Sequence, residues 1–91
     1  MSRPVVATHV LAFPISSMGK DLSLVEIRRP TWGDIRKASG SDDPGTALIV
    51  ACTGIPTADV LRLDAADGMA LDGIIGGFLA APGISAPNSA P

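Results

Sequence analysis

The chain has one cysteine and one histidine among its 91 residues. A single cysteine cannot form an internal disulfide or contribute to a thiolate metal cluster. Cys52 lies in the apolar stretch ALIVACTG, where we expect a buried, unreactive thiol. His9 lies in a run of β-forming residues, where we expect a hydrogen-bonded side chain and not a ligand. The sequence therefore predicts no metal site and no cofactor.

Aromatic residues make up 3% of the chain, and tyrosine is absent. A surface that grips single-stranded nucleic acid usually offers several rings for base stacking, which this chain cannot supply. Residues 47–63 nevertheless have the outline of a helix-turn-helix, with an apolar helix, a glycine turn and a second helix. That second helix holds Arg62 alone, opposed by Asp59, whereas a DNA reader neutralises several phosphates. A small DNA-binding regulator is therefore kept only as the alternative function.

Catalytic and membrane signatures are also missing. No Ser–His–Asp set is evident, and no carboxylate pair is obviously held in a cleft for acid–base work. The segment GSDDPGT (Gly40–Thr46) has the spacing of a phosphate loop but lacks its lysine. The apolar runs fall short of the ~20 residues of a membrane helix, and the first residues lack the apolar core of a signal peptide. We predict a cytoplasmic protein that is not an enzyme and does not bind a membrane.

Apolar residues are plentiful, at 46% of the chain, and their spacing predicts the fold class. Two alternating runs around a glycine turn favour an antiparallel hairpin, which needs helices to pack on because a lone hairpin is marginal in water. We expect a single α+β domain over residues 8–80, with an N-terminal two-stranded hairpin packed on three or four short α-helices. Residues 1–7 are expected to be flexible, and the Pro/Ala/Ser-rich residues 81–91 are expected to be disordered. The predicted elements are the hairpin, 8–29, and helices at 31–39, 45–53, 56–62 and 64–80.

The junction between the hairpin and the first helix carries several local signals. Pro30 ends the second strand, because the residue before a proline stays extended. Thr31 is a good N-cap, and Asp34 at the third helical position completes a capping box. Trp32, the only tryptophan, is expected to pack the hairpin onto the helices. The predicted structural residues are Pro30, Thr31, Trp32, Asp34, Gly54 and Asp64, the last capping the fourth helix together with Asp67.

The last predicted helix carries an apolar stripe at helical spacing. It also carries four glycines, each costing about 1 kcal/mol relative to alanine, so the helix needs packing or a partner. The glycines at 73, 76 and 77 lie on one side, where either another backbone approaches or solvent does. The stripe itself is either core or a partner-binding surface. Its candidate residues are Met69, Leu71, Ile74, Ile75 and Phe78.

Charge is unevenly distributed. Residues 1–37 hold six basic and three acidic side chains, and residues 38–91 hold one basic and six acidic side chains. This polarity can steer a partner or a second copy, although ordinary surface charge is the simpler interpretation. Arg28 and Arg29 are either surface charge of the hairpin or the anchor for an acidic partner, and a homo-oligomer is possible.

Four short motifs follow one another along the chain: EIRRPTWGD (Glu26–Asp34), ACTGIP (Ala51–Pro56), LRLDAAD (Leu61–Asp67) and GGFLA (Gly76–Ala80). Taken in order, they resemble the phage tail assembly chaperones of contractile-tailed and Mu-like phages. The resemblance covers roughly Thr8 to Ala80. The sequence departs from the family pattern in a shortened loop at GSDDPG, in the glycine-rich last helix, and at Cys52, where leucine is more usual.

The resemblance implies a non-enzymatic function. Such proteins are thought to bind the tape measure protein, a long helical ruler, to keep it soluble and to help the tail tube protein polymerise around it. They act in the host bacterial cytoplasm and are generally absent from the mature virion. For this chain the resemblance implies the tape measure protein as partner, with the tail tube protein as a further candidate.

Overall fold

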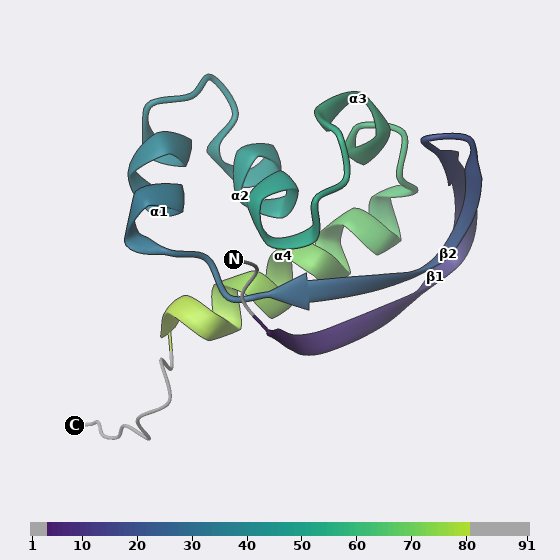
Figure 1. Ribbon diagram of the computed structural model, residues 1–91, viewed down its shortest axis with the longest axis horizontal. Coiled ribbons are helices and arrows are strands. Elements are labelled where there is room, and N and C mark those ends of the chain that lie inside the picture. Colours follow the sequence, from purple (N-terminus) through teal and green to yellow (C-terminus); the bar gives the residue numbers. More distant parts are fainter. Residues whose placement is uncertain (1–3, 81–91) are drawn as a thin grey trace.

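The computed structural model describes residues 4–80, which form a hairpin followed by four helices (Figure 1). This order confirms the predicted α+β fold class. The expected disordered tail at 81–91 lies outside the described residues, as do residues 1–3. The elements are β1 (Val5–Ser17), β2 (Lys20–Arg28), α1 (Trp32–Ser39), α2 (Pro44–Thr53), α3 (Thr57–Val60) and α4 (Ala65–Ala80).

The hairpin is longer than predicted at both ends. Met18 and Gly19 alone form the turn, with φ of 52° and 78°, which is the positive-φ pattern of a type I′ turn. The strands therefore pair up to Ser17 and Lys20, and the turn between them is only two residues long. β1 also begins at Val5 and not at Thr8, because Val5 pairs with Arg28 and Ala7 pairs with Ile27, with a register shift at the residue between them. The prediction that residues 5–7 are flexible was wrong.

A large irregularity interrupts β1 in its middle. Val10 pairs with Leu24 and Ile15 pairs with Leu22, so residues 11–14 of β1 oppose Ser23 alone. This bulge turns Leu11 into the core, where its exposed fraction is 4%. The bulge also contains Pro14, which has no backbone N–H. Because Pro14 lies outside the regular ladder, no ladder hydrogen bond is lost there.

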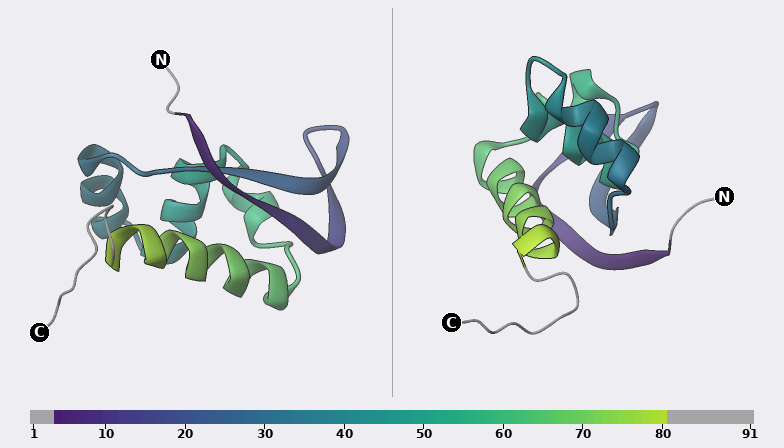
Figure 2. Two further views of the ribbon diagram at one scale, coloured as in Figure 1. Left: turned by 90° about the horizontal axis from the view of Figure 1, so that it is seen from below. Right: turned by 90° about the vertical axis from the view of Figure 1, so that its left-hand side faces the viewer.

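The helices lie on one side of the hairpin, as Figures 1 and 2 show. The core between them is aliphatic and draws on the hairpin, α2, α3, α4 and the segment between α2 and α3. Partly buried residues such as Leu22, Ile74 and Phe78 close its edges. The buried apolar cluster comprises Leu11, Val25, Ile27, Ile49, Cys52, Ile55, Val60, Leu71 and Ile75.

The helix termini follow the local sequence signals. Thr31 Oγ1 accepts a hydrogen bond from Asp34 N–H at 3.1 Å, and Asp34 Oδ2 accepts one from Thr31 N–H at 2.9 Å, so both halves of the capping box are present. Asp43 caps α2 through Thr46 N–H at 3.2 Å, ahead of Pro44 in the first turn. Gly54 ends α2 in the left-handed region with φ of 79°. Only α3 is much shorter than expected, with four residues where residues 56–62 were predicted.

Trp32 does not join the hairpin to the helices, contrary to the prediction. Its side chain is 72% exposed, and the guanidinium carbon of Arg36 lies 5.9 Å from the centroid of its ring. Trp32 is the first residue of α1, and the residue that α1 buries is Ala38, six positions later. The tryptophan therefore lies on the outward side of the helix.

We expect Gly54→Ala to lower the free energy of unfolding by about 1 kcal/mol, because a Cβ strains the left-handed backbone even though the space beside it is open. Thermal unfolding monitored by circular dichroism measures the change. Gly40→Ala is the matched control, because Gly40 ends α1 with φ of −88°, where alanine is not strained. Equal free energies of unfolding for the two variants would contradict a left-handed backbone conformation at Gly54.

Candidate functional site

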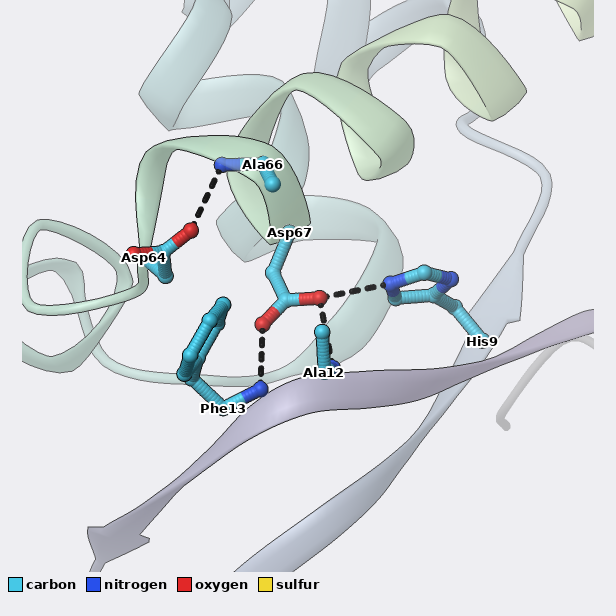
Figure 3. A network of polar contacts seen from close by, with 6 residues as sticks. All are labelled: His9, Ala12, Phe13, Asp64, Ala66 and Asp67. Carbon is cyan, nitrogen blue, oxygen red and sulfur yellow. Dashed lines mark hydrogen bonds and ion pairs between the residues drawn. The ribbon is translucent and has the colours of Figure 1, made fainter.

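The buried carboxylate of Asp67 joins α4 to the bulge of β1. Asp67 is 1% exposed and accepts hydrogen bonds from Ala12 N–H at 2.8 Å and Phe13 N–H at 3.0 Å (Figure 3). His9 Nε2 lies 3.0 Å from Asp67 Oδ1, so the only histidine of the chain has its hydrogen-bond partner on α4. The bulge leaves two backbone donors without a strand partner, and Asp67 satisfies both.

Sequence reasoning assigned Asp67 to the cap of α4, and this was wrong. Asp64 alone caps the helix, by accepting from Ala66 N–H at 3.0 Å (Figure 3). Asp67 lies one turn before Leu71 on the buried face of α4, and its carboxylate points away from the helix terminus toward β1. The helical spacing to Leu71 was a signal for this position, because residues four apart share a face.

The contacts of Asp67 lower the pKa of its carboxyl below the ordinary value of 3.8. The Ala12 N–H is the largest cause; burial opposes it, and the contacts with His9 and Phe13 add to the lowering. A carboxyl whose pKa is lower in the folded chain stabilises the fold above the unfolded pKa of about 3.9. This contribution is lost as the pH falls through the folded-state pKa.

A second polar cluster joins the tip of the hairpin to α3. Ser17 Oγ donates to Asp59 Oδ2 at 2.6 Å, and this bond is the main cause that lowers the pKa of Asp59. Arg62 pairs with Asp59 Oδ1 at 2.9 Å and donates to the backbone carbonyl of Ser16.

These contacts bear on the helix-turn-helix alternative. Arg62, the single arginine of its second helix, is held by the hairpin. With four residues, α3 makes about one turn, which is too short for a recognition helix.

The predicted stripe on α4 is mostly core. Leu71 and Ile75 are 0% and 2% exposed, so they are not available to a partner. Ile74 and Phe78 are half-buried and pack against the core. Met69 is 75% exposed. The five candidates therefore do not form one surface, because only the exposed Met69 lies wholly on the outer side of the helix.

Arg29 is explained by an intramolecular contact. Its guanidinium carbon lies 5.5 Å from the centroid of the Phe78 ring, and Nη2 donates to the Phe78 carbonyl at 3.4 Å. A cation at the C-terminal turn of α4 stabilises the helix. Arg28 is half-buried, and its Nε is buried without a hydrogen-bond partner among the described residues.

The glycines of α4 do not receive another backbone within the described part of the chain. No heavy atom lies within 4 Å of the place where a Cβ would stand on Gly73, Gly76 or Gly77. The sequence left open whether another backbone or solvent lies beside these glycines. Among residues 4–80, no other backbone does. Packing through the opposite face of α4 offsets the cost of these glycines.

The hairpin carries an exposed apolar pair that sequence reasoning did not select. Val10 and Leu24 are direct cross-strand partners, with exposed fractions of 71% and 46%. The adjacent pair, His9 and Val25, faces the helices, because Val25 is buried and His9 contacts Asp67. Neighbouring pairs in a ladder point to opposite faces, so Val10 and Leu24 lie on the face turned away from the helices. We call these two residues the outer pair.

Reactive chemistry is not indicated in the described part of the chain. Burial raises the pKa of the Cys52 thiol to about 11, so the thiolate needed for nucleophilic attack is scarce at neutral pH. Within residues 4–80, no three His, Cys, Asp or Glu side chains gather as metal ligands. None of the helices over the same residues combines the length and hydropathy needed to cross a bilayer. The exposed apolar side chains, and not a reactive group, are the candidate functional feature.

Comparison with known proteins assigns the chain to a family. Residues 8–80 match the family described as "Phage tail assembly chaperone proteins, E, or 41 or 14". The chain belongs to this phage tail assembly chaperone family. No curated protein and no solved structure matches it. As a tail assembly chaperone the protein is not an enzyme, and its partners are tail proteins.

We expect Asp67→Asn to lower the melting temperature of the chaperone on the order of 10 °C at pH 7, because an amide cannot accept from both bulge N–H groups and also satisfy its own donors. The variant should also lose less stability than the unaltered chain between about pH 5 and pH 3, since the lowered carboxyl pKa is gone. Thermal unfolding across pH tests both effects. Asp72→Asn, at an exposed position, is the control and should follow the unaltered chain.

We expect Ile74→Asp combined with Phe78→Asp to unfold the chaperone, because both side chains pack against the core and an unpaired charge there is costly. Unfolding is measured as loss of the helical circular dichroism signal at 25 °C. Met69→Asp, on the exposed side of the same helix, should keep a near-normal melting temperature. A folded double variant would show that these residues are surface.

Proposed function

We propose that this chain binds the tape measure protein, keeps it soluble before assembly and aids formation of the tail tube around it. The observation that carries the proposal is the family match over residues 8–80. The proposed place of action is the cytoplasm of the host bacterium during phage assembly, and the chaperone would be absent from the mature virion. The tail tube protein is a possible second partner.

We place the binding surface on the outer face of the hairpin, centred on the outer pair. This replaces most of the α4 stripe, since Leu71 and Ile75 are buried. Val10 and Leu24 lie side by side, so one apolar side chain of a client can contact both. Exposed apolar groups that touch one another mark interaction sites more strongly than isolated ones.

The chemistry of the client suits such a surface. A long helical protein with apolar stripes must be shielded from its own copies before assembly. A small apolar surface binds one turn or two of such a helix weakly. Many copies along one long client raise the overall avidity without any strong single contact. The proposal therefore requires weak, largely apolar and repeated binding.

We expect Val10→Asp combined with Leu24→Asp to weaken binding of tape measure segments at least about tenfold, because the apolar contact is replaced by two charges. Isothermal titration calorimetry with purified segments, or co-purification of the co-expressed proteins, measures it. Binding to the unaltered chain should change little between roughly 0.1 and 0.5 M salt, since an apolar contact is not screened.

Ala58→Asp combined with Ala65→Asp is the matched control. It adds the same charge at exposed positions in the first turns of α3 and α4, where aspartate suits the helix. The control should bind normally. If no complex forms with tape measure segments while the chain binds duplex DNA at moderate salt, the proposal fails in favour of the DNA-binding alternative.

A further inference from the structure

The two edges of the hairpin differ in whether a further strand can pair with them. The edge of β1 is interrupted by the bulge at 11–14, which contains Pro14, and Asp67 of α4 occupies two of its N–H groups. These are devices by which proteins block the pairing of an edge strand. β2 has neither device: Lys20–Arg28 is continuous strand with no proline and no inserted residue. In the described sheet, β2 pairs with β1 only, so its other edge is open.

The space beside that open edge is hollow. One depression of about 490 Å³ is lined by the start of β2 and the residues that follow α2, and a second of about 220 Å³ is lined by the rest of β2. Leu22, Thr53 and Ile55 line both, so the two depressions adjoin along the strand. Lys20 lines one and Glu26 the other, and both side chains are exposed.

The sequence of β2 is complementary to itself in one register. When two copies of one strand pair antiparallel about a two-fold axis, residues opposite one another lie on the same face of the sheet. Because side chains alternate between the faces, opposite residues differ by an even number of positions. The axis therefore passes through a residue and not between two residues. An axis at Ser23 places Lys20 opposite Glu26 twice and Leu22 opposite Leu24 twice. An axis at Leu24 places Lys20 opposite Arg28, which repels. On one face the Ser23 register therefore combines charge complementarity with apolar contacts between Leu22 and Leu24. On the other face it places Ser23 opposite Ser23 and Asp21 opposite Val25.

We propose that β2 pairs with β2 of a second copy of this chain about a two-fold axis at Ser23, which joins the two hairpins into a four-stranded antiparallel sheet. In this register Arg28 lies beside the Met18–Gly19 turn of the second copy. The carbonyls of that turn can accept from the guanidinium of Arg28, a half-buried side chain whose buried Nε has no acceptor within the described residues of its own chain. The inference stands apart from the proposed client, because it rests on the edge of the strand and not on its outer face.

Pairing would also enlarge the apolar outer surface. Leu24 of each copy would lie next to the axis, beside the half-buried Leu22 of the other, which packs in part against the core, and Val10 continues the row across β1. The outer pairs of two chains would then form one apolar band across four strands. A band of that width contacts more of a helix than the two residues of a single chain.

Charge exchange tests the register with the full chain. Lys20→Glu and Glu26→Lys should each weaken self-association about tenfold, because each single change creates two like-charge pairs across the axis. The double variant Lys20→Glu/Glu26→Lys should recover the affinity of the unaltered chain, since attraction is restored with the signs exchanged. Sedimentation velocity over a range of concentrations measures the dissociation constant, and circular dichroism verifies the fold of each variant.

Lys37→Glu is the matched control. It makes the same charge change on the exposed surface of α1, away from the strand, and should leave self-association unchanged. Single variants that associate like the unaltered chain, or a double variant that stays as weak as the singles, would overturn the proposed register. A chain that stays monomeric at millimolar concentration would overturn the pairing altogether.

A cysteine on the axis gives an independent test. Residues directly opposite in an antiparallel pair lie roughly 4.5–5.5 Å apart between Cα atoms, which a disulfide can bridge. Ser23→Cys should therefore form a covalent dimer under mild oxidation, whereas Ser39→Cys, on the exposed surface of α1, should not. The buried Cys52 does not compete. Equal cross-linking of the two variants would contradict a two-fold axis at Ser23. Because neither experiment includes a tape measure segment, failure here leaves the proposed client untouched.

Discussion

The contact between the Asp67 carboxylate and the bulge of β1 organises the rest of this structure. A two-stranded hairpin is marginal in water, so it must be attached to the helices. Asp67 provides the attachment by satisfying two backbone N–H groups that the bulge removes from the ladder, and His9 completes the set. The bulge in turn directs Leu11 into the core and interrupts the edge of β1. The face that packs and the face that stays exposed both depend on this one arrangement, which also blocks the edge of β1 and not that of β2.

The aliphatic core explains why the chain tolerates an unfavourable last helix. α4 contains four glycines in 16 residues and is weak on its own. Its inner face is fully engaged: Asp67 contacts β1, Leu71 and Ile75 are buried, and Arg29 holds the last turn. Packing therefore stabilises the helix from one side and leaves its glycine side free. A helix held in this way makes a poor partner surface on its buried side, which moves the candidate surface to the hairpin.

The hairpin then carries both proposed interactions without conflict. Its outer face presents the outer pair, and its β2 edge presents unpaired backbone with complementary charges. A face contact uses side chains and an edge contact uses main-chain hydrogen bonds, so a client and a second copy can be bound together. With the proposed helical client, pairing would double the surface offered at each position along that client.

Local features of this protein were determined by the sequence alone. The capping box at Thr31 and Asp34, the cap and proline that open α2, and the left-handed Gly54 each depend on neighbours within a few residues, so short-range rules identify them. Hairpin and helix order followed from periodicity, and the family motifs lie on these same elements. The roles of Asp67, Trp32 and Arg29 could not be read this way. An aspartate three residues after Asp64 fits a cap as well as a buried acceptor, and only the bulge 55 residues away from it in the chain decides between them. Tertiary structure also decided which residues of the α4 stripe are covered and which strand edge is open, because burial depends on what packs against an element and not on the element's own pattern.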